Sequence, residues 1–121
     1  MLLTVDPYFG ISNIIFIWDT AMTNVTSFLG RFGFENCEFF IDTATANYVN
    51  CSADSMFLNC YFKTARSGYV RFTNNNATNC IFDEAKILHD TSNHQIAFYR
   101  CIFNKCINFS STLYVFRATG E

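Results

Sequence analysis

The sequence predicts an all-β fold assembled from short repeats. Two observations lead to this prediction: a four-residue motif recurs about every twenty residues, and no stretch shows the apolar spacing of a long amphipathic helix. Copies of the motif read "NCEF" at Asn36–Phe39, "NCYF" at Asn59–Phe62, "NCIF" at Asn79–Phe82 and "RCIF" at Arg100–Phe103. Because half of the residues are hydrophobic and only 15% are charged, the composition excludes a disordered chain.

The spacing of the motif sets the length of the repeat. Successive copies begin at Asn36, Asn59, Asn79 and Arg100, so the period is nearly constant. Asn13 precedes Asn36 by the same number of residues as Asn36 precedes Asn59, and Phe16 then stands in the Phe position of the motif. The chain therefore divides into five repeats over residues 11–121, and residues 1–10 form an entry segment or N-terminal cap.

Each repeat carries up to three short β-type segments, separated by turn-forming Asn, Asp, Ser, Thr and Gly. An apolar segment comes first; it ends at Phe34, Phe57 and Phe98, and it is weak at Asn74–Thr78. The motif itself is the second segment. The third reads "NVTSF" at Asn24–Phe28, "YVNC" at Tyr48–Cys51, "YVRF" at Tyr69–Phe72, "ILHD" at Ile87–Asp90 and "YVFR" at Tyr114–Arg117.

Three strands in roughly 20–23 residues are the geometry of a parallel β-helix, whose turns must stack to bury their inward faces. Stacked strands lie about 4.8 Å apart, so equivalent residues form ladders along the axis. We expect an inward Cys ladder, an inward Phe ladder, and an Asn ladder at a turn, where amide side chains can bond to their neighbours. The members are Cys37, Cys60, Cys80 and Cys101; Phe16, Phe39, Phe62, Phe82 and Phe103; and Asn13, Asn36, Asn59 and Asn79.

The motif pattern resembles that of right-handed parallel β-helix proteins, in which Asn-Cys-x-Phe turns are common. This resemblance covers nearly the whole chain and implies a single right-handed coil of about five turns. The segment "YRCIFNKC" at Tyr99–Cys106 also resembles turns of the large early-region-1B protein of adenoviruses. That family is related to trimeric β-helical proteins on reptile adenovirus capsids, so the resemblance implies a viral particle protein.

The six cysteines are predicted to be buried free thiols, not a disulfide framework. Ladder neighbours point the same way with Cβ atoms nearly 5 Å apart, whereas a disulfide needs roughly 3.5–4.5 Å and facing vectors. Cys101 and Cys106 have no second close pair, so the spacing does not favour zinc, and no cofactor is indicated.

Charge and hydropathy limit the partners. The net charge is −2, the pI is about 5.6, and no Lys/Arg cluster occurs, so we expect neither nucleic acid nor an anionic membrane as a partner. The most apolar run, Ile14–Trp18, is too short to span a bilayer, which needs roughly 20 residues. No signal peptide is visible, so the sequence predicts a soluble protein, located in the virion if the protein is viral.

The sequence shows no catalytic constellation. Many β-helix enzymes cut polysaccharides with outer acidic residues; the candidates Asp42, Asp54, Asp83, Glu84 and Asp90 do not recur at one phase of the repeat. His89 and His94 flank a polar segment that reads as a loop between strands. We therefore assign no catalytic or metal residue, and favour a protein without enzymatic activity.

Tyr61, Ile81 and Ile102 stand between the inward Cys and Phe of three successive repeats, so they should point outward. Such an outward apolar stripe predicts cover by another chain, in a homo-oligomer such as a trimer or by other particle proteins. The favoured function is a structural or attachment protein of a viral or phage-like particle. The alternatives are a carbohydrate-active hydrolase or lyase, for which a glycan would be the partner, and a cell-surface adhesin fragment.

Overall fold

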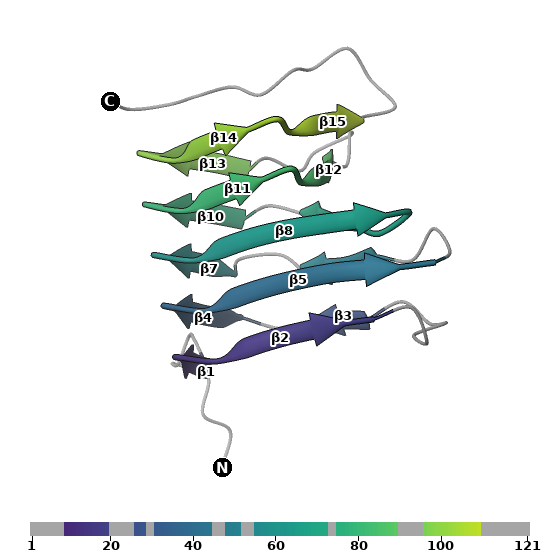
Figure 1. Ribbon diagram of the computed structural model, residues 1–121. Coiled ribbons are helices and arrows are strands. Elements are labelled where there is room, and N and C mark those ends of the chain that lie inside the picture. The colour runs from purple at the N-terminus through teal and green to yellow at the C-terminus, as the bar shows by residue number, and fades with distance from the viewer. Residues whose placement is uncertain are drawn as a thin grey trace.

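A computed structural model describes residues 9–19, 26–28, 31–44, 48–51, 55–72, 75–89 and 96–109. These residues form fifteen strands in three five-stranded sheets, and every pairing between strands is parallel (Figure 1). The prediction of an all-β chain with parallel strands is confirmed.

Each of the three sheets contains one strand from every repeat. Sheet A contains β1 (Phe9–Ser12), β4 (Phe32–Glu35), β7 (Met56–Leu58), β10 (Asn75–Thr78) and β13 (Ile96–Tyr99). Sheet B contains β2 (Ile15–Trp18), β5 (Glu38–Thr43), β8 (Tyr61–Arg66), β11 (Ile81–Asp83) and β14 (Ile102–Asn104). Sheet C contains β3 (Thr26–Phe28), β6 (Tyr48–Cys51), β9 (Tyr69–Phe72), β12 (Lys86–His89) and β15 (Ile107–Phe109).

Consecutive strands belong to different sheets, and every third strand returns to the same sheet beside its predecessor. Repeat 1 therefore comprises β1–β3, and repeat 5 comprises β13–β15; Figure 1 shows the five repeats stacked in chain order. Residues that pair between neighbouring sheet B strands occupy the same position in successive copies of the motif. Phe39, for example, pairs with Phe62, and Phe62 pairs with Phe82.

The turn from sheet A to sheet B has the same backbone conformation in all five repeats. Its first residue is left-handed, with φ between 53° and 60°, at Asn13, Asn36, Asn59, Asn79 and Arg100. Asn tolerates this conformation better than most residues with a side chain. The backbone N–H of Asn36 donates to the carbonyl of Leu58 at 3.0 Å, and the other Asn residues bond in the same way. Asn therefore recurs because of backbone geometry; the expected bonds between side-chain amides do not occur among the described residues.

A similar turn leads from sheet B to sheet C in the last two repeats. Glu84 and Lys105 adopt φ of 49° and 51°, and the small side chains of Ala85 and Cys106 follow them. In repeat 3 the longer strand β8 instead ends at Arg66, whose φ is 55°.

The core lies between the three sheets and consists largely of phenylalanine rings. Phe39, Phe62 and Phe82 are completely buried. The Phe62 ring stacks on Phe39 at a centroid distance of 4.6 Å and on Phe82 at 4.8 Å. Rings from the other two sheets, Phe57 and Phe72, meet Phe62 edge-on at 5.3 and 5.7 Å. Such pairs add about 0.5–1.5 kcal/mol each beyond the burial of their area.

The ends of the Phe ladder are less enclosed than its middle. Phe16 is half-buried, and Phe103 is 39% exposed although its ring stacks on Phe82 at 5.0 Å. Each ring is covered by the repeats before and after it, and β14 is the last strand of sheet B that the structure describes.

Two segment boundaries differ from the expected ones. Strand β1 begins at Phe9, within the expected entry segment. The third strand of repeat 5 is β15, so "YVFR" at Tyr114–Arg117 does not take that place, and this segment lies outside the described residues. In the described part of the chain, no helix is long and apolar enough to cross a membrane.

Candidate interaction face

The candidate site is the outer face of sheet B, where alternate residues of five stacked strands point away from the core. The register aligns these residues in columns along the stack. The first outer column contains Ile15, Glu38, Tyr61, Ile81 and Ile102. The second outer column contains Ile17, Phe40, Lys63, Asp83 and Asn104.

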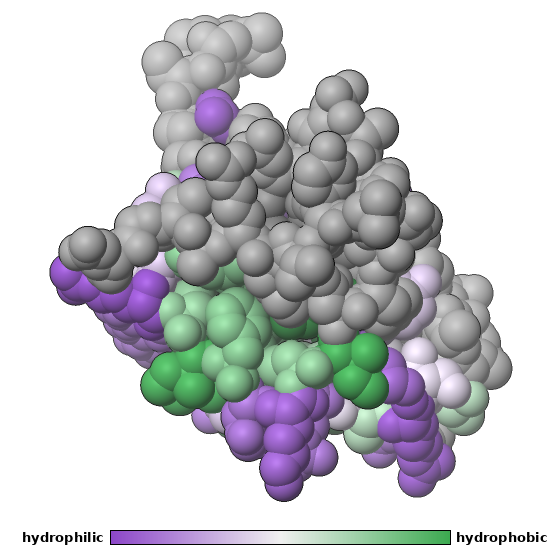
Figure 2. All heavy atoms as spheres, turned by 90° about the horizontal axis from the view of Figure 1, so that it is seen from above, coloured by the Kyte–Doolittle hydropathy of each residue, from purple (hydrophilic) through white to green (hydrophobic). Residues whose placement is uncertain are grey.

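Four isoleucines on this face are exposed. In repeat 1, Ile15 and Ile17 are 59% and 70% exposed; in repeats 4 and 5, Ile81 and Ile102 are 40% and 60% exposed. Figure 2 looks down the stack from its repeat 5 end, where an apolar area with polar residues beside it is also visible. The sequence interpretation placed Ile81 and Ile102 on this face but missed Ile15, which occupies the same phase in "NIIF".

The outward stripe of Tyr61, Ile81 and Ile102 was expected to be apolar, but Tyr61 forms a polar contact in it. Its hydroxyl donates a hydrogen bond to Asp83 Oδ2 at 2.6 Å, its side chain is half-buried, and its ring lies 5.7 Å from that of Phe40. The hydrogen bond to Asp83 raises the pKa of Tyr61 to about 12. The same bond, followed by one from Asn104, lowers the pKa of Asp83. In the middle of the first outer column, a side-chain hydrogen bond therefore links repeat 3 to repeat 4.

The charged groups in the middle of the face pair with one another. Lys63 Nζ lies 3.7 Å from Asp83 Oδ2 and 3.5 Å from Glu84 Oε1. Arg66 Nε lies 3.1 Å from Asp42 Oδ1. Partly exposed pairs of this kind contribute only about 0–1 kcal/mol each to stability. Because each positive charge lies beside a negative charge of a neighbouring repeat, the middle of the face has no large area of positive or negative charge alone.

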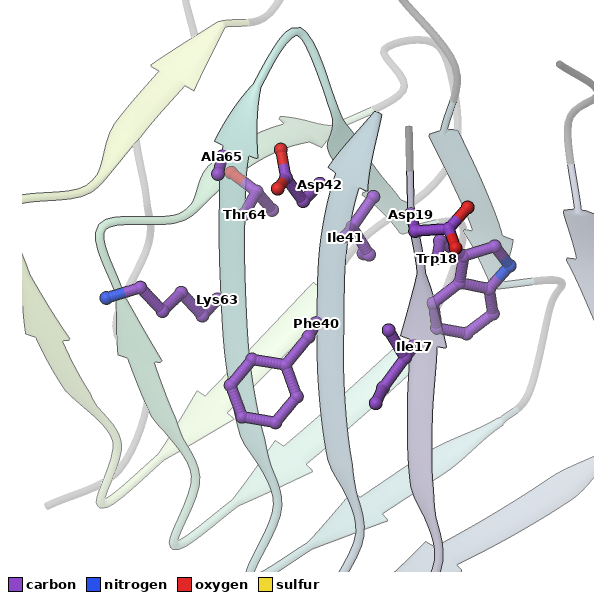
Figure 3. Close-up of a pocket in the computed structure, with 9 residues that line it drawn as sticks. All are labelled: Ile17, Trp18, Asp19, Phe40, Ile41, Asp42, Lys63, Thr64 and Ala65. Carbon is purple, nitrogen blue, oxygen red and sulfur yellow. The ribbon is translucent and has the colours of Figure 1, made fainter. Parts of the chain in front are cut away.

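A groove of about 480 Å³ runs beside these ion pairs on the first three repeats. The side chains of Ile17, Phe40 and Lys63 lie side by side along it, one from each of β2, β5 and β8 (Figure 3). The groove is lined by Ile17, Trp18, Asp19, Phe40, Ile41, Asp42, Lys63, Thr64 and Ala65.

The acidic candidates from the sequence do not form a described catalytic pair. Asp42 pairs with Arg66, while Asp83 and Glu84 pair with Lys63. The remaining candidates, Asp54, Asp90 and His94, lie outside the described residues, as does the side chain of His89.

The cysteines following the turns share one hydrogen-bonding geometry. The Cys60 thiol donates to the carbonyl of Leu58 at 3.4 Å and to that of Phe34, one repeat earlier, at 3.5 Å. Cys106 follows the other turn and donates in the same way to Phe82 at 3.0 Å and Asn104 at 3.6 Å. A small apolar side chain with a weak donor thus suits this position. Five cysteines are described as free thiols, namely Cys37, Cys60, Cys80, Cys101 and Cys106.

The thiols differ in acidity. Burial raises the pKa of Cys37 and of Cys106. Hydrogen bonds with Cys101 and then with Cys60 raise the pKa of Cys80, and burial raises it further. The hydrogen bond with Cys80 lowers the pKa of Cys101, which is only half-buried, to about 7.

Cys101 is expected to react with iodoacetamide before the other described thiols. The thiolate is the reactive form, so the alkylation rate should rise through about pH 7 and level off above it. Peptide mapping of the native protein between pH 5 and 10 would measure this order. A Cys101→Ser variant should lack the fast phase; a fast phase that persists in this variant would contradict the assignment.

Among the described residues, no group of three or more His, Cys, Asp or Glu side chains is arranged to hold a metal ion. Comparison with protein-family models and comparison with curated proteins both gave no match for this chain.

Proposed function

We propose that this chain is a right-handed parallel β-helix with a non-enzymatic structural or attachment role, as a homo-oligomeric component of a viral or phage-like particle. The observation that carries the proposal is the set of four exposed isoleucines on the outer face of sheet B, at Ile15, Ile17, Ile81 and Ile102. They form two pairs, one in repeat 1 and one in repeats 4 and 5, with Glu38 and Tyr61 between them in the first outer column. Exposed apolar side chains that gather on one face of a protein mark interaction sites.

The right-handed coil is supported by the connectivity. After it leaves a sheet, the chain forms one strand in each of the other two sheets. It then returns to the first sheet, parallel to the strand that it left and beside it. Crossovers between parallel strands of one sheet are right-handed in about 98% of cases. The identical turn conformation in every repeat supports one continuous coil.

A second copy of the chain is the partner that the face fits. Complete burial of a side chain such as Ile81 or Ile102 contributes roughly 1.5–3 kcal/mol. The charges of Lys63, Asp83 and Glu84 are already paired within the face, so a partner does not have to neutralise them. The net charge of −2 leaves little repulsion between copies.

The shape of the face suits rotational symmetry. The first outer column crosses five stacked strands, a length of about 19 Å at the usual strand spacing. Copies whose stacks lie parallel can place the same column against one another around a shared axis, which gives a closed assembly. A threefold axis is the arrangement that we propose.

Glycan binding is the second candidate function, and the groove beside Phe40 favours it. An aromatic ring next to the polar groups of Asp42 and Lys63 is a surface on which a sugar ring can stack and form hydrogen bonds. A glycan-binding and glycan-degradation screen separates the two candidates. Binding that Phe40→Ala abolishes would favour glycan recognition, and degradation would contradict the non-enzymatic proposal.

Changing both Ile81 and Ile102 to Lys is expected to reduce the oligomer to a monomer, because two charges would then have to be buried in the interface. Sedimentation velocity over a range of concentrations would measure the mass. Circular dichroism should show an unchanged β spectrum, because both side chains point outward.

The matched control is Met56→Lys, which changes an exposed apolar residue on the outer face of sheet A. It should leave the oligomer intact. A wild-type chain that sediments as a monomer at the highest concentration would contradict the proposed assembly.

A further inference from the structure

Two backbone hydrogen bonds join neighbouring repeats at each turn from sheet A to sheet B. The left-handed residue of the turn donates its N–H to the following repeat; Asn79, for example, donates to the carbonyl of Tyr99 at 2.9 Å. The first residue of the sheet B strand donates to the preceding repeat; Ile102, for example, donates to the carbonyl of Cys80 at 2.9 Å. Both bonds recur wherever one of the five repeats meets the next.

The two ends of the stack carry the two halves of such a joint. At the repeat 5 end, the donor position is the N–H of Arg100 and the acceptor position is the carbonyl of Cys101, and neither group bonds to a described residue. At the repeat 1 end, the acceptor position is the carbonyl of Ser12. The donor position is the N–H of Ile15, which points away from repeat 2 because the carbonyl of Ile14 points toward it. The ends therefore offer each other a donor and an acceptor in matching positions.

The charges of the two ends are opposite in sign. Among the described residues, repeat 5 carries two exposed basic side chains, Arg100 and Lys105, and no acidic one. The described part of repeat 1 carries the exposed Asp19 and no basic side chain. If the register of sheet B continued from repeat 5 onto repeat 1 of a second copy, Ile102 would pair with Ile15, and Asp19 would lie one position beyond Lys105. Opposite charges in such positions favour and orient association.

The same placement would bury apolar surface. Ile102 is 60% exposed and Ile15 is 59% exposed. Within the chain, Ile81 and Ile102 are already paired in the first outer column, and Ile15 of the next copy would extend this column by one residue. The Ile102→Lys substitution described above would therefore weaken this joint as well as the lateral contact.

We propose that copies of this chain join end to end, with repeat 1 of one copy continuing the stack on repeat 5 of the next. Such a joint is heterologous, because it uses different surfaces of the two copies, and it does not close into a ring when the copies follow one straight axis. Each copy would advance the assembly by five strand spacings, or about 24 Å. The end-to-end joint is distinct from the lateral contact through the outer face of sheet B.

Hydrogen exchange of the full wild-type chain tests the backbone part of the joint. The Arg100 amide would donate to Ser12 of the next copy, so its exchange should slow at least tenfold as the protein concentration is raised. The Asn79 amide is the internal control, because it occupies the same turn position one repeat earlier and bonds within its own chain. Its exchange should not depend on concentration.

Charge reversal at either end tests the electrostatic part. One variant carries both Arg100→Glu and Lys105→Glu, and the other carries Asp19→Lys; glutamate is compatible with the left-handed turn, as Glu84 shows. Each variant alone should need at least a tenfold higher concentration than the wild type to elongate. An equal mixture should elongate again, because opposite charges then meet at every joint between the two variants. Sedimentation velocity separates this growth from lateral assembly, since a closed oligomer reaches a fixed mass.

Two results would overturn the proposal. One is exchange of the Arg100 amide that does not change with concentration: constant protection would mean that the chain itself covers this end, and constant exposure would mean that no copy binds there. The other is a mixture of the two charge-reversed variants that stays as small as its components while the wild type elongates.

Discussion

Replacing Phe62 with Ala is expected to lower the free energy of unfolding by about 3–5 kcal/mol, the range measured for buried aromatic truncations. Phe62 is completely buried in the middle repeat, and its ring contacts Phe39 and Phe82 along the stack. Its removal would leave a cavity that two neighbouring repeats cannot close, because their own backbone positions are fixed by the hydrogen bonds of three sheets.

Chemical denaturation of the variant and of Glu38→Ala would test this expectation. Glu38 lies on the outer face of sheet B, so its truncation should cost little. Equal small losses in both variants would contradict the inward position of the Phe ladder and the register of sheet B with it.

Gly68→Ala is expected to lower the free energy of unfolding by about 1–3 kcal/mol, as overpacked substitutions do. A Cβ atom at Gly68 would lie 2.7 Å from the carbonyl oxygen of Ile41 and 2.9 Å from Thr43 Oγ1. These atoms belong to β5, so the clash can be relieved only by moving one repeat relative to the next.

Gly10→Ala is the matched control, because a Cβ atom at Gly10 would meet no atom within 4 Å. Thermal melts should show a lower midpoint for Gly68→Ala and no loss for Gly10→Ala. An unchanged midpoint for Gly68→Ala would contradict the close approach of repeats 2 and 3.

The stacking of the repeats could be predicted from the sequence because the register of the sheets equals the spacing of the motif. Phe39, Phe62 and Phe82 recur at the same phase, and strand alternation then fixes which neighbours point outward. The same alternation identified Ile81 and Ile102 as exposed residues.

Contacts between repeats could not be predicted in the same way. The hydrogen bond from Tyr61 to Asp83 joins residues of different phase, so no repeated letter reveals it. The reason for Asn at each turn was also missed, because sequence shows the residue and not its φ; Arg100 in the same conformation shows that backbone geometry is the shared property. Gly68 has no equivalent in the motif, since the close approach occurs where β8 extends further than the later sheet B strands.

We propose that the outer face of sheet B is buried against a second copy of the chain. Relaxation of isoleucine and methionine methyl signals by a soluble paramagnetic agent tests it most directly. At high protein concentration, we expect the methyl groups of Ile81 and Ile102 to be protected from the agent, while that of Met56 on sheet A is not. Dilution should remove the protection. Equal relaxation of all three residues at every concentration would contradict the claim.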